Sequence, residues 1–415
     1  MTETPPTSTP IIIAALAGAF LFSLLYATVT PRNVIVSHKK EDSIRSCLSP
    51  PGAPIGLLLE ERAKANARLV KAFGLSNTFV EEDEGVHAGF VGKAKELLKE
   101  ATRRGWGDFR DLARQAVRHE LSEVLSGGTA RVEFDALVQG VCLRVVLVGL
   151  LGVEASVESF AKEDVVKAAS HINLLWALSK KPGQTPPHLL PELRVVLRRL
   201  VPDTEKYPNP VDFVIPAWET LWRVVAGAVA HAHEDDGMME ALEGLYERPG
   251  RQSFDSTSQG GVAVRNIINE TMRVYPPSKH IGRARRRQCA MHLPSFVTKI
   301  IDLVSPAFVR RNESADVLAV QRASGVWGDD AHQFDASRYH RPSTQPMTRK
   351  QQEIALRYLF GAAPLRCVGA SWAPIAAGVI TSAIVCTVRE EGLMIAKGKG
   401  IGGRDGWNGW FVESV

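Results

Sequence analysis

Along most of the chain, apolar residues recur at three- and four-residue spacing, the pattern of helices that bury one face. Residues 57–74 show this pattern first, and it stops at Gly74, a residue type that commonly ends helices. Residues 83–126 are expected to form two helices with a break around 104–107, where two glycines interrupt the pattern. The other predicted helices are 131–152, 155–180, 190–200, 210–233, 238–247 and 261–274.

After Pro277 the spacing of apolar residues no longer indicates helices. Short β-like runs are predicted at residues 296–304 and 317–321, within otherwise irregular sequence. The residues from Gly392 to the C-terminus resemble a glycine-rich β-hairpin, and no internal repeat is visible. The sequence therefore predicts a mainly α fold with a minor β component, organised as one domain over residues 57–415.

An uncharged apolar run of 19 residues occupies positions 11–29. At ~1.5 Å per residue it would span about 28 Å, close to the thickness of a bilayer's hydrocarbon core. Arg32, Lys39 and Lys40 follow it, whereas no Lys or Arg precedes it, so the following domain is expected on the cytoplasmic side, at the endoplasmic reticulum. The expected segments are a short lumenal tail (1–10), a transmembrane anchor (11–30) and a linker (31–56). A cleaved signal peptide is the alternative, although its start should be basic and its apolar core shorter.

Composition narrows the classes of partner and site. The net charge of +5 is mild, and it favours acidic partners or a membrane surface over nucleic acid. The five cysteines are odd in number, scattered and without a C-x-x-C pair, which argues against a disulfide framework or a zinc module. We infer a reducing compartment.

One cysteine has a distinctive setting. Cys367 lies within the sequence FGAAPLRCVG, residues 360–369, just before an apolar run at 372–385. The N–H groups and dipole of a following helix would lower the cost of a thiolate at this position. Such a thiolate can ligate the iron of a haem. A buried structural cysteine is the alternative when the residue is taken alone.

A charged pair adds to this signal. Glu270 and Arg273 form an E-x-x-R motif on one face of a predicted helix, although residues 100–103 repeat the same spacing. The pair becomes informative because two further motifs follow it in a fixed order, FDASRY at 334–339 and then the cysteine loop. Together these segments resemble the cytochrome P-450 family, the haem-thiolate monooxygenases, and the resemblance covers roughly residues 57–415.

The resemblance implies a fold of the cytochrome P-450 type and a haem b cofactor. Cys367 would be the axial ligand of the haem iron, with Phe360 packed beside it. Glu270, Arg273 and Arg338 would form a buried charge network beneath the haem.

The resemblance also implies further site residues. The phrase IPAWET at 215–220 looks like the family's oxygen-activation motif, so that Glu219 and Thr220 would handle protons during cleavage of dioxygen. Arg366 and His87 would reach the haem propionates.

The function implied is a membrane-anchored monooxygenase that inserts one atom of O2 into a lipophilic small molecule. Electrons would come from NADPH through a flavoprotein reductase. The phrases IPAWETLWR and WGDDAHQFDASRY look most like fungal members, many of which tailor specialised metabolites. One alternative is a haem-thiolate isomerase or peroxide-using enzyme that needs no reductase.

A degenerate, non-catalytic membrane protein of the same fold is the other alternative, and it is motivated by departures from the family pattern. Ala363 stands where the loop usually has Gly, and Leu365 stands where a propionate-binding Arg or His is usual. The segment between the anchor and the first predicted helix is also too short for the family's usual first helix and opening strands.

Three other motifs give weaker indications of function. Residues 398–403 satisfy G-x-G-x-x-G, but no predicted helix follows to hold a pyrophosphate, so a nucleotide site is rejected. His231, His233 and Glu234 could suggest metal ligands, but positions i and i+2 diverge on a helix. The arginine-rich segment 283–287 is expected to be a solvated surface patch, with docking of an acidic flavoprotein as its functional reading.

Overall fold

The computed structural model describes residue 18 and residues 35–127, 131–181, 183, 185–286, 296–297, 310–340 and 346–414. Apart from residue 18, the expected anchor over residues 11–30 lies outside these described residues, as do Cys289 and all of the expected strand at 296–304 except 296–297. The expected function of those segments therefore stays a prediction.

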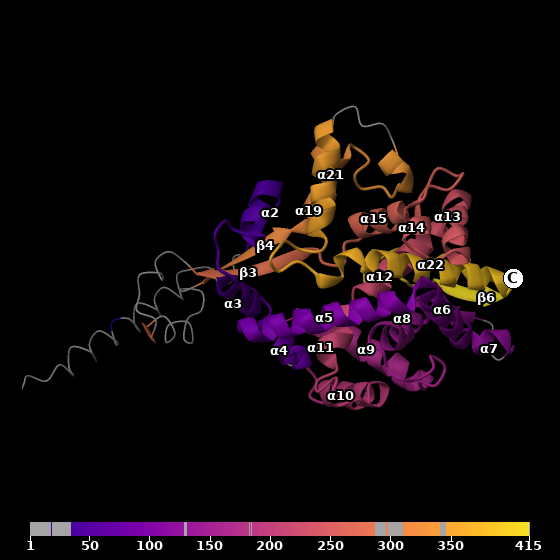
Figure 1. Cartoon of the computed structure of the whole chain (residues 1–415), viewed down its shortest axis with the longest axis horizontal. Helices are drawn as coiled ribbons and strands as arrows, with labels where there is room; N and C mark the ends of the chain where they lie inside the picture. The colour runs from indigo at the N-terminus through magenta and orange to yellow at the C-terminus, as the bar shows by residue number, and fades with distance from the viewer. Residues whose placement is uncertain are drawn as a thin grey trace, which may run out of the picture.

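Helices dominate the described chain, as the apolar spacing predicts (Figure 1). The helices of the first part are α2 (Glu41–Leu48), α3 (Ile55–Ala65), α4 (Ala67–Phe73), α5 (Glu84–Arg104), α6 (Trp106–Glu120), α7 (Ser122–Leu125), α8 (Phe134–Val145), the π-helical turn η1 (Val146–Leu150), α9 (Lys162–Leu178) and α10 (Leu189–Leu200). Those of the second part are α11 (Val211–Trp218), α12 (Leu221–Ala232), α13 (Asp236–Glu247), α14 (Arg251–Asp255), α15 (Val264–Val274), α19 (Val317–Gln321), α20 (Ser324–Trp327), η2 (Ala336–His340), α21 (Pro346–Tyr358), η3 (Val368–Ser371) and α22 (Ala373–Glu390).

Local sequence explains several helix ends. Gly74 ends α4 in the left-handed region, at φ 61°, where a residue without Cβ is favoured. Gly105, at φ 93°, separates α5 from α6, as the expected break at 104–107 requires. The carboxylate of Asp83 accepts the N–H of Val86 at 2.8 Å and caps the start of α5.

The described residues also form two small sheets. In the first, β1 (Val36–His38) lies parallel to β4 (Arg310–Asp316), and β3 (His280–Arg286) lies antiparallel on the other side of β4. The second has the antiparallel order β2 (Arg131–Glu133), β6 (Phe411–Ser414) and β5 (Leu393–Ala396), so the predicted C-terminal hairpin is present. Figure 1 places β3 and β4 at one end of the molecule and β6 at the opposite end.

The structure differs from the sequence-based expectations at several places, and the expected helix over 210–233 is divided into α11 and α12. The expected strand at 317–321 is wrong: these residues form the helix α19, because the Asp316 side chain accepts the N–H of Ala319 at 3.0 Å and caps a helical turn. The expected linker over 31–56 contains folded structure, namely β1 and α2. Ile44, Cys47 and Leu48 of α2 are completely buried, in a small core of their own with residues near β4 and α21.

The main core surrounds α22, which packs against α6, α12, α13 and α15. Within the described residues, Val211–Ala232 and Ala373–Glu390 are long and apolar enough to cross a membrane. However, 72% and 78% of the residues in their most apolar windows are buried in the protein, so both serve as core helices.

Candidate functional site

Cys367 lies in the loop that joins α21 to η3 and α22. The loop is folded back on itself, because the backbone N–H of Cys367 donates to the carbonyl of Phe360 at 2.8 Å. Gly361 makes the turn at φ 76°, in the left-handed region that favours glycine, and its N–H donates to the carbonyl of Tyr358 at 3.0 Å. The turn therefore brings Phe360 and Cys367, which sequence analysis placed together, into direct backbone contact.

The thiol of Cys367 differs from the other described thiols in its exposure. Cys367 is exposed, whereas Cys47, Cys142 and Cys386 are buried. Burial raises the pKa of Cys47 to about 11 and that of Cys386 to about 12, so these thiols stay protonated near neutral pH. Among the described cysteines, Cys367 is thus the one that an external group can reach.

The protein around Cys367 also contains groups that favour its thiolate. Desolvation by the surrounding protein raises the pKa of the Cys367 thiol above its ordinary value. A hydrogen bond from the backbone N–H of Gly369 and the positive charge of Arg366 act in the opposite direction and lower the pKa. An accessible sulfur with an N–H donor and a neighbouring cation is the donor chemistry that an axial haem thiolate requires, so these residues fit the group.

The two residues expected at the haem propionates have different surroundings. Arg366 is exposed and makes no hydrogen bond to another described residue, so its guanidinium can bind a carboxylate. His87 lies on α5, and its Nδ1 is 2.7 Å from the hydroxyl of Thr78. Burial, followed by the charge of Arg62, lowers the pKa of His87, which favours the neutral imidazole. The structure therefore gives His87 a protein partner.

Glu270 and Arg273 face each other on α15, with neither side chain exposed to solvent. Two parallel hydrogen bonds join them, from Arg273 Nε at 2.8 Å and from a terminal guanidinium nitrogen at 2.7 Å. The remaining Arg273 donors reach the backbone carbonyls of Gln321, Ala331 and Gln333. All the charged atoms of this pair consequently have partners, as a buried ion pair requires.

Arg338, from η2, joins the same carboxylate. Its Nε lies 3.3 Å from Glu270 Oε1, and its other nitrogens donate to Asp330 and to the carbonyl of Trp327. Tyr339, which sequence analysis did not single out, donates its hydroxyl to Glu270 Oε2 at 3.1 Å. The structure therefore brings Glu270, Arg273 and Arg338 together, and the network fixes the segment that leads towards α21 and the cysteine loop.

Glu219 and Thr220 lie at the joint between α11 and α12. Glu219 is 2% exposed, and its carboxylate forms ion pairs with Arg223, at 2.8 Å, and with Arg404. Thr220 is partly buried at the same joint. Glu219 is therefore not on a solvated helix face, and two guanidinium groups compensate its buried charge.

Neither arginine partner of Glu219 was predicted from the sequence. The i,i+4 spacing of Glu219 and Arg223 is a signal that could have indicated the first partner. Arg404 lies in the loop between β5 and β6, far from Glu219 in sequence, and no local pattern links the two. Only the folding of the C-terminal hairpin over the helices brings them together.

The glycine-rich motif at 398–403 serves the packing of the C-terminal hairpin. A Cβ on Gly398 would lie 2.4 Å from the carbonyl oxygen of Asn408, and one on Gly402 would lie 2.7 Å from the ring of Tyr275. Close backbone approach therefore explains these glycines, and no helix follows them that could hold a phosphate.

The expected solvated basic patch at 283–287 is wrong for Arg283 and Arg285, whereas Arg286 is exposed. Arg283 is 3% exposed, and Arg285 lies 3.5 Å from the carboxylate of Glu313. Arg286 pairs with Glu60 of α3 at 3.0 Å, while residue 287 lies outside the described range. Carboxylates from α3 and β4 meet the positive charges of β3, so the arginines stabilise the sheet rather than forming a free docking surface.

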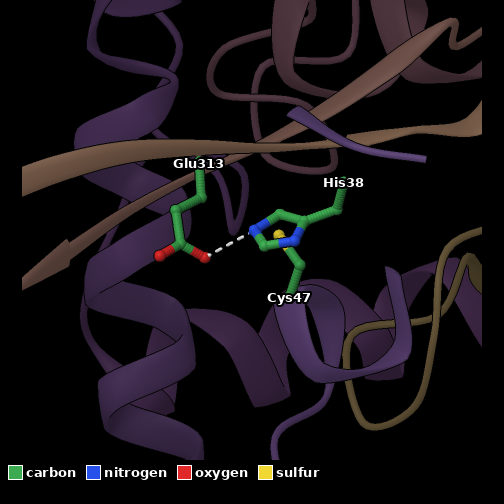
Figure 2. Close-up of side chains that lie close together, drawn as sticks. All are labelled: His38, Cys47 and Glu313. Atoms are coloured by element: carbon green, nitrogen blue, oxygen red, sulfur yellow. Dashed lines mark hydrogen bonds and ion pairs between the residues drawn. The ribbon is translucent and has the colours of Figure 1, made fainter. Parts of the chain in front are cut away.

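Figure 2 shows three side chains that point toward one another from β1, α2 and β4: His38, Cys47 and Glu313. Their potential ligand atoms lie within 4.8 Å of one another, and among the described residues they form the one such group. His38 Nε2 is 3.0 Å from one oxygen of Glu313, and Arg311 donates its Nε to the other at 3.0 Å. With a protonated Cys47 thiol, this is a hydrogen-bonded link that holds the N-terminal segment against the sheet.

Comparison with curated proteins finds distant plant relatives, and no protein-family model matches the chain. An 11-oxo-beta-amyrin 30-oxidase of Glycyrrhiza uralensis is 27% identical over 122 residues, which cover 29% of this chain and 20% of that protein. A cytokinin hydroxylase of Arabidopsis thaliana is 26% identical over 146 residues, covering 35% of this chain and 24% of that protein. The chain thus matches about a quarter or less of the length of these relatives.

Comparison of structures covers far more of the chain. The ligand-free structure of cytochrome P-450 OleT matches with a TM-score of 0.56 over 91% of this chain and 88% of that one, at 12% sequence identity. At this identity the match establishes the fold. The mainly helical architecture with small sheets that the sequence predicts is therefore confirmed.

Proposed function

We propose that the chain is a distant member of the cytochrome P-450 family and that it acts as a haem-thiolate monooxygenase on a lipophilic small molecule. Partial similarity to the plant oxidase and hydroxylase and the shared fold support this proposal. The observation that carries this proposal is the setting of Cys367, the exposed thiol among the described cysteines, with a backbone N–H and a cation beside it. When bound, haem b would supply the activation of O2 and the insertion of one oxygen atom into the substrate.

The residues of the chain have separate roles in this proposal. Cys367 Sγ is the axial ligand, Arg366 is available to a haem propionate, and Glu270, Arg273 and Arg338 fix the polypeptide that leads into the cysteine loop. The propionate role proposed for His87 requires its bond to Thr78 to open. Phe360 holds the loop through its carbonyl.

Thr220 and Glu219 form the proposed route for protons. The hydroxyl Oγ1 of Thr220 donates a proton, and Glu219, at the same helix joint, passes to it a proton that its carboxylate first accepts from solvent. The apolar faces of α11 and α12 keep bulk water away from the rest of the site, since most of their residues are buried. Between catalytic cycles, the ion pairs of Glu219 with Arg223 and Arg404 hold the carboxylate in position.

We extend the proposal to the setting of the enzyme. The anchor at 11–30 would hold the catalytic domain on the cytoplasmic face of the endoplasmic reticulum, where a flavoprotein reductase delivers electrons from NADPH. The local phrases that resemble fungal sequences support a role in tailoring a fungal specialised metabolite.

Turnover under isotopically labelled O2 tests the proposed activity. With NADPH and a reductase, we expect one labelled oxygen atom in the product and none in the Cys367→Ala variant. Product formed with peroxide and without reductase would instead establish the peroxide-using enzyme. Folded protein that takes up no haem would establish the non-catalytic alternative.

A further inference from the structure

A cluster of cations lies beside the helix joint that carries Glu219. Arg404, from the loop between β5 and β6, and Arg223, from α12, both pair with the Glu219 carboxylate. Their side chains are 12% and 11% exposed. Two guanidinium groups therefore share one buried carboxylate, so the local charge is already positive.

Two further cations come from α4 and from the end of α9. The guanidinium carbons of Arg404 and Arg68 lie 5.0 Å and 5.4 Å from the ring centroid of the same residue, Trp176 of α9. Arg68 also donates to the hydroxyl of Ser179, next to Lys180. Segments distant in sequence thus place Arg68 and Arg404 at one indole ring and Arg223 and Arg404 at one carboxylate, with Lys180 beside Ser179 at the end of α9.

The single Glu219 carboxylate does not balance the positive charges of the cluster, because Arg68 and Lys180 form no ion pair with a described acid. Partial burial, followed by the charges of Arg404, Arg68 and Arg223, lowers the pKa of Lys180, which lies at the exposed edge of the cluster. Electrostatic repulsion of this kind costs free energy that a bound anion would recover.

Arg404 has a donor available to such an anion. Burial dominates and lowers the pKa of Arg404 to about 10, although the nearby carboxylate of Asp405 raises it. Its Nε atom is buried and has no hydrogen-bond partner among the described residues. A buried charged donor without an acceptor is costly, and a ligand oxygen would satisfy it.

We propose that Arg404, Arg68 and Lys180 bind the carboxylate of an apolar organic acid, whose hydrocarbon part lies against Trp176 and the α11–α12 joint. This inference rests on the proposed function and names the substrate class of that site. A carboxylate matches the planar donor fork of a guanidinium, and the aromatic pair Trp176 and Phe73, 5.9 Å apart, offers apolar surface beside it.

Equilibrium dialysis of the full chain with its haem measures the binding of dodecanoate and of 1-dodecanol, which differ in charge at equal chain length. We expect dodecanoate to bind at least about tenfold more tightly, because charge-assisted hydrogen bonds have no counterpart in the alcohol. Arg404→Gln and Arg68→Gln should each weaken dodecanoate binding by roughly ten- to a hundredfold and leave 1-dodecanol unaffected. Lys350→Gln, which removes an exposed lysine of α21, is the control and should bind both probes as the wild type does.

Glu219→Gln should have the opposite effect on binding from the arginine variants, because it removes the carboxylate that competes for Arg404. Dodecanoate should bind this variant more tightly, whereas general loss of structure would weaken it. Equal binding of the acid and the alcohol by the wild type, or unchanged dodecanoate binding in Arg404→Gln, would overturn the inference. Tight, Arg404-dependent dodecanoate binding by protein that lacks a thiolate-type haem spectrum would instead overturn only the proposed function.

Discussion

Glu270 and Arg273 form a two-bond ion pair at 2.7 and 2.8 Å, with both side chains fully buried. The same E-x-x-R spacing on α5 gives Glu100 and Arg103 a comparable separation of 2.8 Å, but on the surface, where their side chains are 51% and 74% exposed. Identical motifs therefore have different physical consequences, because burial decides what happens when one charge is removed.

We expect Glu270→Gln to lower the free energy of unfolding by about 3–5 kcal/mol, since it leaves Arg273 and Arg338 buried without their counter-charge. Urea unfolding followed by circular dichroism measures the change. Glu100→Gln is the matched control, and it should alter stability little because solvent screens the exposed pair. Equal effects of the two substitutions would show that the buried network does not stabilise the fold.

Two helical glycines give a second matched comparison. A Cβ on Gly378 of α22 would lie 2.9 Å from Val264 Cγ1 and 3.0 Å from the ring of Phe254, whereas one on Gly244 of α13 would meet no atom within 4 Å. Gly378→Ala should destabilise the protein, because overpacking costs about 1–3 kcal/mol against a gain of about 1 kcal/mol in helix propensity. Gly244→Ala should stabilise it, by about 0.5–1 kcal/mol. Thermal unfolding of both variants checks the signs, and a stabilising Gly378→Ala would contradict the close packing of α22.

His231 makes stability depend on pH. Its ring stacks on Phe334 with centroids 3.8 Å apart, and its Nε2 lies 3.1 Å from the hydroxyl of Tyr275. Burial, then the charges of Lys397 and His233, lower the pKa of His231 from 6.5 to about 4. Between these values the unfolded chain binds a proton that the folded chain does not, so stability is lost as pH falls from 6.5 towards 4.

The loss from this one group should be on the order of 3 kcal/mol across that window. His231→Gln keeps a polar partner for Tyr275 and removes the titration, so its unfolding free energy should fall less steeply with acidification. Chemical unfolding at a series of pH values between neutrality and pH 4 compares the two slopes. Parallel slopes would mean that His231 is not a buried neutral imidazole.

Thiol labelling checks the exposure that singles out Cys367. In haem-free protein, iodoacetamide should modify Cys367, while Cys47, Cys142 and Cys386 stay protected under native conditions by burial and raised pKa values. Peptide mass spectrometry reports the site of modification. Rapid native labelling of Cys142, which is fully buried in the main core, would contradict the described packing.

The sequence predicted those parts of the molecule that depend on local pattern. Helical spacing and glycine breaks placed α5, α6 and α15, and the order of motifs placed Glu270 and Cys367. It failed where contacts between distant segments decide the outcome. The supposed linker is folded because His38 meets Glu313, 275 positions away. Arg285 and Arg286 of β3 form ion pairs because acids from other elements reach them.

Local sequence patterns also gave one wrong element, at 317–321, and an incomplete set of partners for Glu219. The apolar run at 317–321 suggested a strand, but the preceding Asp316 caps it as a helix, a signal that was present in the sequence. For the site, the motif around Glu219 was visible, whereas its neutralisation by Arg404 depends on the path of the C-terminal hairpin.

The absorption spectrum of the reduced, carbon-monoxide-treated protein tests the central claim, that Cys367 ligates a haem iron. Wild-type protein loaded with haem should show the red-shifted Soret band of thiolate ligation, and Cys367→Ala should lack it while Cys386→Ala retains it. Wild-type protein that stays colourless after incubation with hemin, or a Cys367→Ala variant that keeps the thiolate band, would contradict the account.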